Sequence, residues 1–137
     1  MQAGHKQLIV ILGFLTNLTF GQVTSFKIRK ASDTPRLTIA KTDTGFVTLG
    51  QILDDKKLTI INGTDNIKIR FYDAIVTTGG QPKIFTGNNS ILTKKIVAEL
   101  KRDKKANAVN LTIFNVVAFN DSNETIHLND IRITVLK

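Results

Sequence analysis

The fold is decided by residues 87–136, whose sequence is GNNSILTKKIVAELKRDKKANAVNLTIFNVVAFNDSNETIHLNDIRITVL. Thr93 suits the N-cap of a helix over residues 94–102, because its hydroxyl can accept a hydrogen bond from the first helical turn. At about 3.6 residues per turn, the apolar side chains of this helix share one side. These are Ile96, Val97 and Leu100.

Two β-rich runs follow the helix, residues 109–119 and 125–136, and the turn-forming residues 120–124 separate them. We expect the two runs to form a β-hairpin. Because an amphipathic helix gains most of its stability by packing against other elements, the hairpin and the strands before it are the surface that we expect it to cover.

Short runs of alternating apolar and polar residues precede the helix, and each predicts a half-buried strand. The run at residues 67–76 is long enough that a bend or bulge near Asp73 is expected. We therefore predict a mostly β fold: an antiparallel β-sandwich, immunoglobulin-like in the loose sense, with one short amphipathic helix in a crossover connection. The earlier runs are residues 22–30, 36–41, 46–49 and 58–61.

Length and composition predict a single domain. The chain has 137 residues, 42% of them hydrophobic, no cysteine and a formal net charge of +8. Such a chain has enough apolar material for one core, and that core must hold the domain together without disulfides.

The first residues predict a cleavable signal peptide. Lys6 precedes the apolar run 8–15, and the small residues Thr19 and Gly21 stand before Gln22. Polar residues interrupt the run well short of the roughly 20 apolar residues of a transmembrane helix. We expect residues 1–21 to be removed, residues 22–137 to form one β-sandwich domain, and the chain to be exported to a bacterial periplasm or secreted.

Several landmarks follow one another over about residues 35–136. They are Pro35, Gly45, Leu53, the runs 58–61 and 67–76, Gly87-Asn88, Thr93, Phe114-Asn115-Val116-Val117 and Leu128-Asn129-Asp130-Ile131. Their order and spacing resemble the C-terminal periplasmic domain of the gliding-motility protein GldM, a component of the type IX secretion system.

The resemblance implies β-sandwich modules, often dimeric, that form a shaft and meet partners at the outer membrane. Members of that family also carry a transmembrane helix, a helical periplasmic region and more than one module. This chain shows a signal peptide and one module, so we expect a free-standing relative with its own protein partner in the cell envelope, of the kind found in Bacteroidetes.

Catalytic patterns are missing from the sequence, and we expect no enzymatic activity and no cofactor. The chain has no cysteine, and the one histidine after the expected signal peptide, His127, cannot form a histidine-paired metal site by itself. An enzyme would depend on isolated carboxylates acting almost unaided. These are Asp54, Asp55, Asp73 and Glu99.

A cluster of basic residues on and after the predicted helix is the candidate binding surface. On a helical wheel its helical members lie opposite the apolar side, so the helix has a basic outer face. Such a face keeps an exported protein soluble, or it docks an acidic protein, anionic lipid headgroups or an acidic glycan. Nucleic acid is disfavoured, since no aromatic residues alternate with the basic ones. The cluster comprises Lys94, Lys95, Lys101, Arg102, Lys104 and Lys105.

Two functions follow from these patterns. The first is a noncatalytic envelope domain that binds another protein through sheet edges or the basic helix face. The alternative is a secreted ligand-binding or inhibitor domain that captures an acidic polymer or enzyme through the same lysines. Affinity for a polymer should fall steeply with ionic strength, whereas affinity for an apolar protein interface should not.

Overall fold

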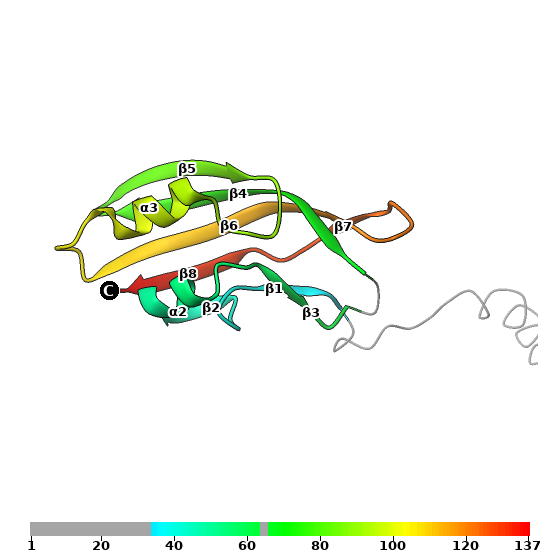
Figure 1. Cartoon of the computed structure of the whole chain (residues 1–137), viewed down its shortest axis with the longest axis horizontal. Coiled ribbons are helices and arrows are strands. Elements are labelled where there is room, and N and C mark those ends of the chain that lie inside the picture. The colour runs from blue at the N-terminus through cyan, green and yellow to red at the C-terminus, as the bar shows by residue number, and fades with distance from the viewer. Residues whose placement is uncertain (1–33, 64–65) are drawn as a thin grey trace, which may run out of the picture. The chain divides into compact units, whose positions relative to one another are not determined.

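The centre of the structure is a six-stranded β-sheet (Figure 1). The computed structural model describes residues 34–63 and 66–137; the expected signal peptide (1–21) and the expected strand at 22–30 lie outside them. The elements are β1 (Arg36–Thr38), β2 (Thr44–Thr48), α2 (Leu49–Asp54), β3 (Thr59–Ile61), β4 (Lys68–Thr78), β5 (Gln81–Gly87), α3 (Lys94–Arg102), β6 (Ala108–Phe119), β7 (Thr125–His127) and β8 (Ile131–Leu136).

The main path of the sheet has the order β2-β8-β6-β4-β5, and β7 pairs with the end of β6. Strands β4, β5, β6, β7 and β8 are joined by antiparallel pairing, whereas β2 pairs parallel with β8. The expected hairpin is present, and its second run is divided into β7 and β8, both of which pair with β6.

A second, two-stranded sheet is formed by β1 and β3. Its buried Leu37 belongs to the same hydrophobic core as Tyr72 of β4, Ile113 of β6 and Ile133 of β8. The mostly β, sandwich-like fold with a short helix is thus confirmed. The parallel β2–β8 pair makes the larger sheet mixed, and α2 is a further helix that the alternation patterns did not predict.

Helix α3 lies in the connection between β5 and β6, the two neighbours of β4, and crosses over β4 (Figure 1). Its predicted N-cap is confirmed, since the Thr93 side chain accepts a hydrogen bond from the Ile96 N–H at 3.3 Å. Ile96 and Leu100 are fully buried on its inner side. The helix therefore covers the inner face of the sheet, as its amphipathic pattern predicts.

The connection from β5 into α3 is fixed by Tyr72, which is fully buried. Its hydroxyl donates to the Ile91 carbonyl oxygen at 2.9 Å, and burial raises the pKa of Tyr72. Gly87 stands opposite Tyr72 in the β4–β5 ladder. A Cβ at residue 87 would lie 2.1 Å from the tyrosine ring, so only glycine fits there without a shift of the ring or strand.

Candidate binding groove on helix α3

The exposed side of α3 borders a groove of about 430 Å³. Four of its lining residues recur at i, i+3, i+4 and i+7 on α3, which places them along one side of the helix. The other three come from the segments around residues 56 and 91. We call this the basic groove, and its lining residues are Lys56, Ile91, Leu92, Lys94, Val97, Ala98 and Lys101.

Backbone hydrogen bonds hold the wall opposite α3. The Leu92 N–H donates to the Lys56 carbonyl oxygen at 2.9 Å, and the Leu58 N–H donates to the Ser90 carbonyl oxygen at 2.7 Å. The Asn89 side chain accepts from the Ile91 N–H at 2.8 Å. These bonds fix the segment before α3 against the segment before β3, so Lys56 is held at the groove by its backbone.

The groove combines apolar surface with positive charge. Ile91 is 54% exposed, so the groove offers an apolar side chain that a ligand can cover. Lys56, Lys94 and Lys101 take part in none of the four ion pairs in the described part of the chain, and no acidic side chain lines the groove. Such a surface suits a ligand with an apolar group and nearby negative charge.

Arg102 and Lys95 do not line the groove. The Arg102 Nε lies 2.9 Å from Oε1 of Glu99, and the Lys83 Nζ lies 3.0 Å from Oε2 of the same carboxylate. Glu99 is almost fully buried, so these two cations compensate its charge. Arg102 therefore has a structural partner within the domain and is a weaker candidate for binding.

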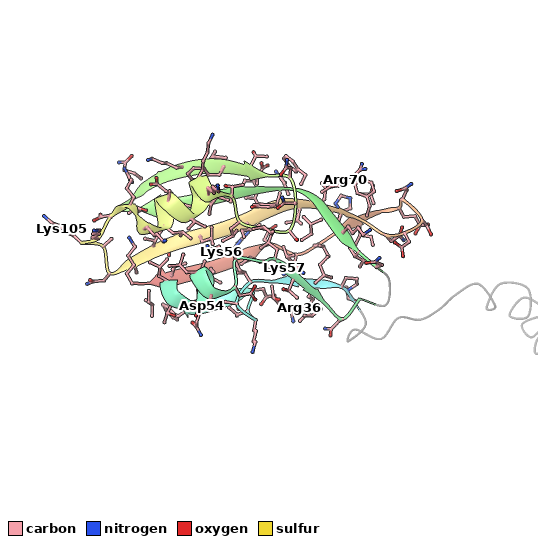
Figure 2. All side chains as sticks on the ribbon, viewed as in Figure 1. Arg36, Asp54, Lys56, Lys57, Arg70 and Lys105 are labelled. Carbon is pink, nitrogen blue, oxygen red and sulfur yellow. The ribbon has the colours of Figure 1, made fainter. Side chains whose placement is uncertain are left out.

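Lys104 and Lys105 lie in the turn after α3, where the Asp103 carboxylate accepts from the Lys105 N–H at 2.9 Å. Figure 2 shows Lys105 at the tip of this turn, well separated from Lys56. All six predicted basic residues are exposed. The structure brings Lys94 and Lys101 of the predicted set to the groove and leaves Lys95, Arg102, Lys104 and Lys105 outside it.

Sequence reasoning missed Lys56 and Ile91 because each meets α3 through pairing between distant segments. It also placed Val97 on the buried side, opposite the lysines. In the structure Val97 is only half-buried, because it stands at the border of the inner side, beside Lys101. In the sequence, the consecutive lysines at residues 56 and 57 were the only sign that a second segment adds positive charge to the groove.

The carboxylates considered for catalysis are dispersed. Asp73 lies on the outer face of β4, between the buried Tyr72 and Ala74, and accepts from Thr86 and Asn115. Glu99 lies on α3, in the ion pairs with Lys83 and Arg102 described above. Within residues 34–63 and 66–137, no group of three or more histidine or carboxylate side chains is placed to hold a metal ion.

Neither a protein-family model, nor a curated protein, nor a solved structure matches the chain. Neither α2 nor α3 is long enough and apolar enough to cross a membrane. The resemblance to the GldM domain and the expected export thus stay predictions from the sequence.

Proposed function

We propose that this chain is a noncatalytic, exported protein-interaction domain whose basic groove binds an acidic segment of a partner protein. The observation that carries the proposal is the pairing of Ile91, Val97 and Ala98 with three lysines in one hollow. An apolar side chain of the partner would occupy the hollow, and flanking carboxylates would meet Lys56, Lys94 and Lys101. Apolar burial supplies affinity in such an interface, and the charges supply orientation and partner choice.

The apolar lining favours a protein segment over an acidic polymer. A polymer that carries charge alone would gain nothing from the exposed Ile91 side chain and would leave it in water. A peptide offers both apolar and acidic side chains at close spacing. The resemblance to the GldM domain adds a location to this proposal, the bacterial cell envelope, and a partner class, a protein of the secretion machinery.

The proposal is tested with two fluorescein-labelled peptides, one with a leucine flanked by glutamates and one with alanine in place of the leucine. The unlabelled protein is residues 22–137, the chain expected after removal of the signal peptide, which we call the mature domain. Binding is measured by fluorescence anisotropy. We expect the leucine peptide to bind more tightly. The triple variant Lys56→Glu, Lys94→Glu, Lys101→Glu should weaken its binding at least about tenfold.

A charge-matched control is the triple variant Lys95→Glu, Lys104→Glu, Lys105→Glu, which changes the net charge equally outside the groove. We expect its affinity to stay within about threefold of the wild type. Equal losses of affinity in both triple variants would show that net charge alone governs binding. That result would contradict the proposal that the basic groove is the binding site. No preference for leucine, together with a steep loss of affinity in salt, would favour the alternative function, capture of an acidic polymer.

A further inference from the structure

Two compensating β-bulges lie side by side in β4 and β6. Ile69 pairs with Ala118 and Phe71 with Val117, so β4 has an extra residue there; Asp73 then pairs with Phe114, so β6 has the extra residue. From Asp73 onward the two strands pair again in the register that they have at Ile69. As a result each strand has two consecutive residues that are not buried, Arg70 and Phe71 in β4 and Phe114 and Asn115 in β6, and the outer face gains one additional side chain from each strand.

The added outer-face side chains border a hollow of about 440 Å³, a volume within the roughly 300–1,000 Å³ of small-ligand pockets. Three of the lining residues form a row across the sheet, since Phe71 pairs with Val117 and Val117 pairs with His127. We call this hollow the bulge pocket. It is lined by Phe71, Asn115, Val116, Val117, His127, Leu128 and Asp130.

Asn115, which lines this pocket, has a backbone conformation that few residues adopt. Its φ is +50°, in the left-handed region that asparagine tolerates better than other non-glycine residues. Its Nδ2 donates to the Asp73 carboxylate at 3.0 Å, and the second oxygen of that carboxylate accepts from the Thr86 hydroxyl at 3.1 Å. This chain of hydrogen bonds fixes the amide, and its oxygen Oδ1 can accept a further hydrogen bond.

The chemistry of the bulge pocket differs from that of the basic groove. Phe71 is 38% exposed and offers an aromatic ring. Around it stand acceptors: the Asn115 amide oxygen and the Asp130 carboxylate, which lies 3.3 Å from an Arg132 nitrogen. His127 can donate or accept through either ring nitrogen. An apolar ring beside several acceptors suits a neutral ligand with an apolar face and many hydroxyl donors.

We propose that the bulge pocket binds a neutral pyranose sugar. The C–H face of the sugar would stack on Phe71, since the face of an aromatic ring carries partial negative charge. Its hydroxyl groups would donate to Asn115 and Asp130 and exchange hydrogen bonds with His127. The proposal is independent of the basic groove, because the two sites share no residue.

The test uses the mature domain labelled with 15N and titrated with methyl α-mannoside, methyl α-glucoside, methyl α-galactoside and N-acetylglucosamine, followed by NMR. We expect at least one sugar to shift the amide signals of Phe71, Asn115 and Leu128 in a saturable way. Phe71→Ala should weaken binding at least about tenfold. Asn115→Gly should do the same while retaining the left-handed backbone, so it separates loss of the amide from backbone strain.

Phe46→Ala is the matched control, because Phe46 is a 73% exposed phenylalanine of β2, outside the pocket. Its affinity for the sugar should stay within about twofold of the wild type. Thermal unfolding of each variant checks the fold. The proposal is overturned if none of the four sugars causes a saturable shift, if both pocket variants bind like the wild type, or if the shifts fall only on basic-groove residues.

Discussion

The side-chain amide of Asn129 pairs with both backbone polar groups of Leu37, 92 residues away in the chain. Its Oδ1 accepts from the Leu37 N–H at 2.6 Å, and its Nδ2 donates to the Leu37 carbonyl oxygen at 3.1 Å. The amide thus acts as a substitute for a neighbouring strand. Because Leu37 is fully buried, these bonds satisfy backbone groups that have little access to water and join the smaller sheet to the entry of β8.

We expect Asn129→Ala to lower the free energy of unfolding by about 2–4 kcal/mol, since two backbone groups beside a buried side chain lose their partner. Urea denaturation followed by circular dichroism measures the loss. Asn110→Ala is the control: Asn110 is exposed on β6 and its amide oxygen accepts from the Thr134 hydroxyl at 3.0 Å, so about 0.5 kcal/mol or less is expected. Similar losses in the two variants would contradict the role given to Asn129.

Gly87→Ala should destabilise the domain by about 3 kcal/mol, because the new methyl group would overlap the Tyr72 ring. Gly50→Ala is the matched control. Its Cβ would meet only the Thr48 hydroxyl, at 3.8 Å, and alanine favours the helix, so the same change should be neutral or stabilise by about 0.5–1 kcal/mol. Thermal unfolding of the two variants gives the comparison, and a Gly87→Ala protein as stable as the wild type would show that the strand shifts freely.

Tyr72 is the only tyrosine of the chain, so tyrosinate absorbance follows it alone. Its pKa is raised above the ordinary value of 10.0 by burial. The folded chain therefore holds the phenolic proton more tightly than the unfolded chain. This contribution to stability is complete below about pH 10 and is lost as the pH rises through the folded-state pKa.

Tyr72→Phe removes this titration and the hydrogen bond to Ile91. We expect it to lower the free energy of unfolding by about 1 kcal/mol at neutral pH and to make the free energy of unfolding less sensitive to pH above about 10. The two proteins differ in no other titratable group, so the difference between them isolates Tyr72. A tyrosinate midpoint at the ordinary value in the folded protein would contradict the prediction.

Local patterns predicted the elements whose signals lie in consecutive residues. The position of α3 follows from Thr93 and the spacing of Ile96 and Leu100, and β4 follows from the alternation that begins at Ile67. Helix α2 was missed although Thr48 and Gln51 form a capping box, because the segment is short and its apolar residues also fit a strand. Strand β5 was missed because Pro82 and the two glycines before it are typical of a loop; at a sheet edge, proline is tolerated.

Half of the candidate groove was predictable for the same reason. Lys94 and Lys101 share a helix face by spacing alone. Lys56 and Ile91 reach that face through backbone pairing between segments that no local pattern connects. The bulge pocket depends on register shifts in two neighbouring strands, and only the bend near Asp73 could be anticipated.

The parallel pairing of β2 with β8 also bears on how the chain completes its fold during synthesis. Val47 pairs with Val135, far along the chain, so β2 stays without its sheet neighbour until β8 has left the ribosome. Contacts this far apart in sequence form slowly. The larger sheet is therefore completed only after β8 has been synthesised. A truncation that removes β8 would leave both β2 and β6 with exposed edges.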